Sequence, residues 1–321
     1  MSVALLFSPQ GSQVVGMARE LADASPAARS VFESADAALG WPVSSLAWYG
    51  PDEELNDTRQ TQPCLVAASL ACLRALEEAL AGHGDELKPA FVAGHSVGEY
   101  AALVAADVVS VDDAVRLVAR RGELMADADV SGGMVAVIGL EREAVAAVVA
   151  ALDAGEELVV ANDNAPGQVV ISGTPSALAS VAEKMRAAGA RRSIPLKVSG
   201  PFHSPMMTGV GIELAAALTE ADWHDADPPV VSNVTAEPVR DATEIRALLA
   251  RQVHSPVEWV RSVRRMAADG VDTFVECGPG GALAAMARRI VPEARTLAVF
   301  DSASLAESAA ALLDAGVGVT A

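Results

Sequence analysis

Residues 94–100 read Gly-His-Ser-Val-Gly-Glu-Tyr, and this stretch decides the fold that we expect for the chain. An apolar run over residues 89–93 precedes it and an alanine-rich run follows it, a pattern typical of a strand, a sharp turn and a helix. A serine on such a turn stands above the edge of a sheet, and glycines two residues to either side, here Gly94 and Gly98, let strand and helix pass closely. We therefore interpret Ser96 as a nucleophile.

A serine hydroxyl that acts as a nucleophile needs an oxyanion donor and a base. The residue after the serine opens a helix whose free N–H groups and dipole face a developing negative charge, so Val97 N–H is a candidate oxyanion donor. The hydroxyl also needs a base, which is usually imidazole. Among five histidines, His203 stands in a loop flanked by glycine and prolines, which would hold an imidazole in one orientation. His95 adjoins the serine, but its side chain should diverge at the turn.

Composition limits the classes of function. A chain of 321 residues accommodates one large α/β unit with an insertion. The net charge of -19 argues against nucleic acid or an anionic membrane as a partner. Three cysteines at no metal-like spacing, no basic leader and no apolar run of spanning length predict a reduced, cytoplasmic protein without a metal site.

The order of patterns predicts two domains. Between residues 134 and 198 the pattern indicates βαββαβ, which suits a small ferredoxin-like domain inserted in a larger α/β unit. We expect the large domain at residues 1–130 and 199–321 and the small domain at residues 131–198.

Within the large domain, several boundaries can be predicted. The first strand should cover residues 3–7, with a helix beginning near Val15, and a long helix should begin at Gln62. Residues 273–276 should form the last clear strand, followed by a second strand-to-helix glycine turn.

Five separated motifs occur together in this chain, and they give it a resemblance to a known family. The chain resembles the malonyl-CoA:acyl carrier protein transacylases, shared by discrete fatty-acid enzymes and acyltransferase domains of polyketide synthases, from Phe7 to about Ile290. The resemblance implies an α/β-hydrolase-like large domain, a ferredoxin-like insert and an active site between them. The motifs are FSPQGSQ at 7–13, GHSVGEY at 94–100, RGELM at 121–125, GPFHS at 200–204 and ECGPGG at 276–281.

The same resemblance implies a role for each matching residue. Ser96 is acylated and His203 is its base, while the backbone N–H groups of Gln10 and Val97 form the oxyanion hole. Arg121 pairs with the free carboxylate of the substrate, a task suited to a planar guanidinium that stays charged.

Further residues complete the implied site. A main-chain carbonyl around Gln252 orients the histidine, and Met125 and Asn162 face the substrate. Phe202 together with an aliphatic residue after the serine resembles the malonyl-selective pattern rather than the methylmalonyl-selective one. The chain departs from the family at Ser8-Pro9, where Pro-Gly is usual, and at Ala126, where glutamine is frequent.

The implied activity is ping-pong transfer. A malonyl group moves from malonyl-CoA, through an ester on Ser96, to the phosphopantetheine thiol of an acyl carrier protein, without a metal or a cofactor. The pathway, fatty acid or polyketide, stays open, and we expect a monomer. One alternative is a hydrolase that clears acyl groups from carrier proteins with the same Ser-His dyad, and a second is a non-catalytic module that docks on carrier proteins.

Overall fold

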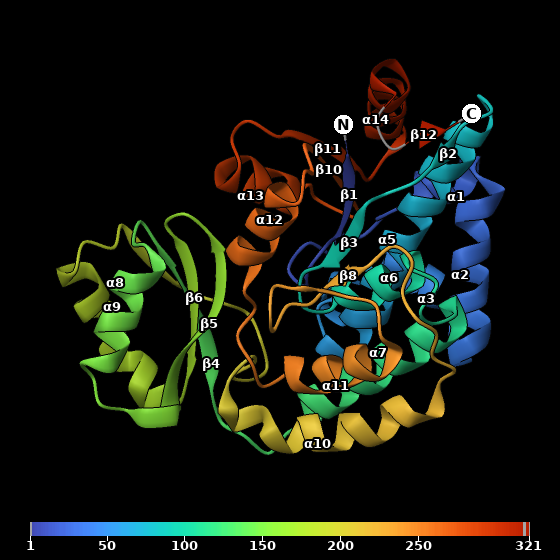
Figure 1. Ribbon diagram of the computed structural model, residues 1–321. Helices are drawn as coiled ribbons and strands as arrows, with labels where there is room; N and C mark the ends of the chain where they lie inside the picture. The colour runs from blue at the N-terminus through green and yellow to red at the C-terminus, as the bar shows by residue number, and fades with distance from the viewer. Residues whose placement is uncertain (1, 317–318, 321) are drawn as a thin grey trace.

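The computed structural model describes residues 2–316 and 319–320 and is built around a six-stranded sheet (Figure 1). The strand order in this sheet is β11-β10-β1-β3-β8-β9. The strands are β1 (Val3–Phe7), β3 (Phe91–Gly94), β8 (Val230–Val231), β9 (Pro238–Val239), β10 (Thr273–Cys277) and β11 (Arg295–Val299). All pairings are parallel except that of β8 with β9.

Helices cover both faces of this sheet. In β1, Val3, Leu5 and Phe7 belong to the larger hydrophobic core, which α5 and α6 close, while Ala4 and Leu6 pack with α12 and α13 on the other face (Figure 1). A parallel strand buried on both faces is expected to be apolar throughout, as β1 is. The helices of the large sheet are α1 (Arg19–Ala24), α2 (Pro26–Leu39), α3 (Val43–Tyr49), α4 (Asp52–Leu55), α5 (Thr58–Ala81), α6 (Gly98–Ala105), α7 (Val111–Asp127), α10 (Thr208–Ala217), α11 (Ala242–Gln252), α12 (Trp259–Ala268), α13 (Ala282–Ile290) and α14 (Ser302–Ala315).

A separate four-stranded antiparallel sheet forms the second unit. Its order is β5-β6-β4-β7, and two helices cover one face around a core that includes Val137, Ile171 and Val181. The chain order βαββαβ confirms the predicted ferredoxin-like arrangement. The elements are β4 (Gly133–Ile138), α8 (Arg142–Ala150), β5 (Leu158–Ala165), β6 (Gln168–Gly173), α9 (Pro175–Ala187) and β7 (Arg192–Pro195). A short ribbon pairs β2 (Glu86–Leu87) with β12 (Val319–Thr320).

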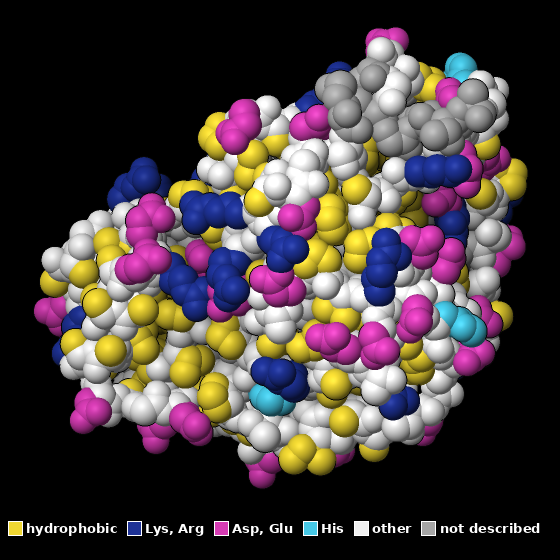
Figure 2. All heavy atoms as spheres, in the orientation of Figure 1, with side chains coloured by type: hydrophobic (Ala, Val, Ile, Leu, Met, Phe, Trp, Pro, Cys, Tyr) yellow, Lys and Arg dark blue, Asp and Glu magenta, His cyan; other side chains and the backbone are white. Residues whose placement is uncertain are grey.

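Polar contacts join the two units. The backbone of β5 bonds to Val257, with Val257 N–H donating to the Ala161 carbonyl over 2.8 Å. Arg142 of α8 pairs with Glu258, and Arg289 of α13 donates to the Gln168 amide oxygen over 2.8 Å. Figure 2 shows basic side chains interspersed with acidic ones along this boundary. Residues of the small sheet are thereby fixed beside the carboxyl ends of the large sheet.

Two predicted helix boundaries and the predicted last strand were wrong. The first helix begins at Arg19 rather than near Val15, because turns occupy residues 15–18 and Ala18 has a left-handed φ of 55°. The long helix begins at Thr58, where the Asp57 side chain caps the Arg59 N–H, and not at Gln62. β11 follows the strand predicted to be the last, and its half-exposed edge position explains its weak apolar pattern.

Among residues 2–316 and 319–320, no helix is both long and apolar enough to cross a membrane.

Candidate active site

Ser96 lies on the turn between β3 and α6 with a left-handed φ of 53°. A Cβ at Gly94 would overlap the backbone of Gly98, and a Cβ at Gly98 would overlap the Phe7 carbonyl, so both glycines are required by close backbone approach. Asn233, which follows the neighbouring strand β8, holds the turn with its side chain. It accepts from Ser96 N–H over 2.7 Å and donates to the Gly94 carbonyl over 2.6 Å. This strained turn presents the hydroxyl at the carboxyl end of the sheet.

His203 lies 2.8 Å from this hydroxyl, measured from Nε2 to Ser96 Oγ. Its Nδ1 contacts the main-chain carbonyls of Gln252 at 2.9 Å and Ser255 at 3.3 Å. Because carbonyl oxygens only accept, the proton of the neutral ring resides on Nδ1, and the Nε2 lone pair faces the serine. His203 itself adopts a φ of 58°, and its N–H donates to the Val253 carbonyl over 3.0 Å.

The environment of His203 keeps the imidazole neutral. Burial, reinforced by the nearby charge of Arg121, lowers the pKa of His203 to about 3. The two carbonyl acceptors oppose this shift without cancelling it. At neutral pH the ring is therefore an unprotonated base within hydrogen-bond reach of Ser96.

Arg121 of α7 is only 1% exposed and lies directly beneath the serine. Its Nη1 donates to Gln62 Oε1 over 2.7 Å, and its Nη2 donates to Gln252 Oε1 over 3.0 Å and to Ser96 Oγ over 3.1 Å. Within residues 2–316 and 319–320 no carboxylate lies at ion-pair distance from this guanidinium. Burial lowers the pKa of Arg121, whose three hydrogen-bond partners are all neutral groups. The neighbouring Arg120 is exposed.

Gln252 contributes more than the main-chain carbonyl that was predicted. Its side-chain Nε2 donates to the Ser96 carbonyl over 2.9 Å and to Glu99 Oε2 over 2.5 Å. Glu99, on the first turn of α6, is 3% exposed, and burial raises its pKa to about 7. Asn233, Gln62 and Glu99 were not predicted as site residues from the sequence. Glu99 belonged to the quoted motif, and its charge beside a nucleophile was the available signal.

A cavity of about 450 Å³ opens above Ser96, between the two sheets. Asn162 reaches it from β5 of the small sheet, while Phe202 lies beside the histidine. Val97 and Arg121 are buried behind this wall and do not line it. Among the predicted site residues, the wall includes Gln10, Ser96, Met125, Asn162, Phe202 and His203.

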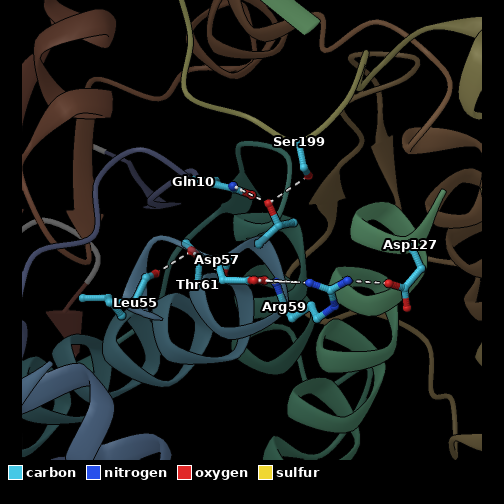
Figure 3. Close-up of polar contacts among 8 residues, drawn as sticks. Gln10, Leu55, Asp57, Arg59, Thr61, Asp127 and Ser199 are labelled. Carbon is cyan, nitrogen blue, oxygen red and sulfur yellow. Dashed lines mark hydrogen bonds and ion pairs between the residues drawn. The ribbon is translucent and has the colours of Figure 1, made fainter. Parts of the chain in front are cut away.

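The loop that carries Gln10 is held by side chains (Figure 3). Gln10 Nε2 donates to Thr58 Oγ1 over 3.2 Å, and Thr58 Oγ1 lies 3.4 Å from Ser199 Oγ in the segment that returns from the small sheet. Ser8, at the departure from the family pattern, donates its hydroxyl proton to Glu276 Oε1 over 2.8 Å. In the described part of the chain, the N–H groups of Gln10 and Val97 have no hydrogen-bond acceptor. Two backbone donors are thus available near the serine.

Among the residues that the structure describes, no group of three or more His, Cys, Asp or Glu side chains is arranged to hold a metal ion.

Comparison with known proteins places the chain among acyl transferases. Residues 4–309 match the acyl transferase domain family. The malonyl CoA-acyl carrier protein transacylase of Bacillus subtilis is 41% identical over 93% of this chain and 93% of its own length. The protein of the same name from Haemophilus influenzae is 42% identical over 94% of this chain and 96% of its own.

Solved structures agree with the sequence relatives. An acyl-carrier-protein S-malonyltransferase from Burkholderia pseudomallei superposes with a TM-score of 0.92 at 40% identity, covering 97% of this chain and all of the other. A malonyl-transacylase in complex with a type II polyketide synthase acyl-carrier protein gives 0.90 at 38% identity, with the same coverage. The mixed α/β fold with a ferredoxin-like unit, predicted from the sequence, is confirmed.

Proposed function

Since the chain belongs to the family of acyl transferase domains, we propose that it transfers a malonyl group from malonyl-CoA to the thiol of an acyl carrier protein. The observation that carries this proposal is the position of Arg121, a buried guanidinium 3.1 Å from Ser96 Oγ that lacks a carboxylate partner in the described chain. A malonyl ester has a carboxylate two carbons from its ester carbonyl. Such a group compensates the buried cation through charge-assisted hydrogen bonds, whereas an acetyl group cannot.

Acylation of the serine starts the reaction. Ser96 attacks the thioester carbonyl while His203 Nε2 takes its proton, and the imidazolium is stabilised by the Gln252 and Ser255 carbonyls. The N–H groups of Gln10 and Val97 donate to the tetrahedral oxyanion. His203 then protonates the departing thiolate, and coenzyme A leaves. The malonyl ester stays on Ser96 with its carboxylate on Arg121.

The second half of the cycle reverses the first. The phosphopantetheine thiol of a carrier protein gives its proton to His203 and attacks the ester, which regenerates the Ser96 hydroxyl. The relatives are named as transacylases, which favours a thiol over water as acceptor and removes support from the hydrolase alternative. A solved relative in complex with an acyl-carrier protein also supports a carrier-protein thiol as the acceptor.

Side chains near His203 limit the size of the acyl group that the cavity accepts. Phe202 and Met125 line the cavity, and the ring of Phe202 occupies space that an α-methyl group would need. One methyl group is worth about 1 to 3 kcal/mol in such a pocket, so malonyl is preferred over methylmalonyl by about 10- to 200-fold. Asn162 contacts the acyl or pantetheine portion from the other wall.

Organisation of the chain is part of the proposal. Residues 1–130 and 199–321 constitute the large domain and residues 131–198 the small domain. The protein is a monomer in the cytoplasm and uses no cofactor, with malonyl-CoA as a substrate.

The proposal is tested by intact-protein mass spectrometry after brief mixing with malonyl-CoA. We expect a malonyl adduct in the wild type and in Ser30→Ala, which changes an exposed serine on α2, but none in Ser96→Ala. An adduct of equal yield in Ser96→Ala would refute the assignment of the nucleophile.

A further inference from the structure

Glu99 is a buried carboxyl group to which the reaction described above gives no task. It lies on the first turn of α6, three residues after the nucleophile, and is 3% exposed. A carboxylate removed from water in this way is costly unless a hydrogen-bond donor and an opposite charge compensate it. Its neighbours therefore indicate what it does.

One amide connects Glu99 to the guanidinium. Gln252 Nε2 donates to Glu99 Oε2 over 2.5 Å, and Gln252 Oε1 accepts from Arg121 Nη2 over 3.0 Å. An amide placed between an anion and a cation is oriented by both, because its NH₂ group faces the carboxylate and its oxygen faces the guanidinium. The orientation of Gln252 is thereby fixed, and with it the main-chain carbonyl that holds His203 Nδ1 at 2.9 Å.

The charges of the pair influence each other directly. Burial raises the pKa of Glu99 to about 7, while hydrogen bonds from Gln252 and Asn233 and the charge of Arg121 oppose that rise. The charge of Glu99 in turn opposes the lowering of the Arg121 pKa by burial. A second carboxylate on Arg121 would weaken this compensation, because two anions would then share one buried cation.

We propose that Glu99 is the resident counter-charge of Arg121, and that it gives up this role by taking up one proton from the buffered solvent when the carboxylate of a substrate reaches the guanidinium. This inference rests on the proposed malonyl transfer. Glu99 acts through Gln252 and Arg121 and is a positioning residue. Because Glu99 is then neutral, the net charge around Arg121 is the same before and after the substrate carboxylate arrives.

The titratable groups that face Glu99 allow the proton to be assigned. Arg121 from α7 and Tyr100 from α6 interact with the charge of Glu99, and the other buried titratable groups of the site are His203 in its loop and His95 on the serine turn. Burial lowers the pKa of His203 to about 3 and that of His95 to about 4, and burial raises the pKa of Tyr100 far above neutrality. Arg121 stays protonated throughout. Of these groups, only Glu99 changes its charge near pH 7.

The sign of the pH effect follows from linkage. A substrate carboxylate binds better to the protonated form of Glu99, so affinity is highest below the pKa of about 7 and falls as the pH rises through it. If the complex holds the Glu99 proton ten times more tightly than the free enzyme does, the half-saturating malonyl-CoA concentration rises about tenfold between about pH 6 and about pH 8.5. Acetyl-CoA has no carboxylate, and its half-saturating concentration should not change with Glu99.

The first experiment measures acylation rates by rapid quench and mass spectrometry across this pH range. We expect the tenfold rise for malonyl-CoA in the wild type and in Glu123→Gln, an exposed partner of Arg120 on α7, and a flat profile in Glu99→Gln. A flat wild-type profile, or a Glu99→Gln profile equal to that of the wild type, would overturn the inference. Absence of any malonyl ester on the wild type would instead overturn the proposed function.

A second measurement keeps the test independent of the folding of Glu99→Gln. Binding of malonyl-CoA to Ser96→Ala is followed by calorimetry at about pH 7.5 in buffers of different ionisation enthalpy, which counts the protons taken up. We expect net uptake of a fraction of one proton with malonyl-CoA and none with acetyl-CoA. Equal uptake with both ligands contradicts the proposal. The coenzyme A portion that both ligands share would then cause the uptake, for which Glu276 is available, because burial also raises its pKa to about 7.

Discussion

Replacement of Arg121 by alanine separates recognition of the substrate carboxylate from the chemistry of the serine. The guanidinium is 1% exposed and donates to two amide oxygens and to Ser96 Oγ. Loss of one partner of a buried ion pair costs about 3 to 5 kcal/mol, because the other charge stays uncompensated. In Arg121→Ala we therefore expect kcat/KM for malonyl-CoA to fall by about two to more than three powers of ten.

The same change should affect acetyl-CoA differently. An acetyl group makes no ion pair with Arg121, and Ser96 and His203 keep their 2.8 Å contact, so acylation from acetyl-CoA should change by less than about threefold. The assay is the ratio of the two acylation rates, measured by rapid quench and intact-protein mass. Arg120→Ala is the matched control, since this adjacent arginine is exposed and pairs with Glu123.

Stability must be followed alongside the rates. Arg121→Ala leaves the side-chain oxygens of Gln62 and Gln252 without a donor, at about 1 to 3 kcal/mol each, but also removes a buried charge. Thermal unfolding at fixed protein concentration shows whether the variant stays folded at the assay temperature. Equal losses with malonyl-CoA and acetyl-CoA in a folded variant, or an equal loss in Arg120→Ala, would refute the assignment of Arg121 as the carboxylate site.

Three further predictions follow from packing and charge. Because burial lowers the pKa of His203 to about 3, kcat/KM for malonyl-CoA should not fall as the pH is lowered from about 7 to about 5, and a decrease centred near 6.5 in this profile would contradict the assignment. Phe202→Ser should raise kcat/KM for methylmalonyl-CoA relative to malonyl-CoA by about 10-fold, and an unchanged ratio would exclude this ring as the size filter. Gly94→Ala should lower the free energy of unfolding in urea by more than about 2 kcal/mol, because its Cβ would overlap Gly98. Gly209→Ala is the control, since its Cβ meets nothing within 4 Å. Similar unfolding midpoints for the two variants would argue against the close turn at Gly94.

The parts of the site that could be predicted are those fixed by local sequence. The turn around Ser96 follows from glycine spacing, and the structure shows the backbone approach that requires both glycines. The βαββαβ order of the small sheet follows from alternating periodicity and was confirmed. The start of α5 was predicted wrongly at Gln62, although the Asp57 cap that begins the helix at Thr58 is also a local signal.

The parts that could not be predicted depend on tertiary contacts. Asn233 reaches the serine turn because β8 lies beside β3, and the contact of Glu99 with Gln252 forms because the end of α11 lies there; no spacing in the sequence encodes these contacts. The position of Gln252 was predicted, but its side chain proved to join three groups in addition to the main-chain contact with His203. An amide has no charge or periodicity that would mark it as part of a network.

The proposed reaction requires that a malonyl ester on Ser96 is transferred to a carrier-protein thiol. The most direct test is to form the ester with malonyl-CoA, remove coenzyme A, and add a carrier protein with or without its phosphopantetheine arm. We expect loss of the ester with an equal gain of malonyl mass on the phosphopantetheinylated carrier, and no change with the unmodified one. Decay of the ester to free malonate at the same rate with either carrier would contradict the proposed reaction.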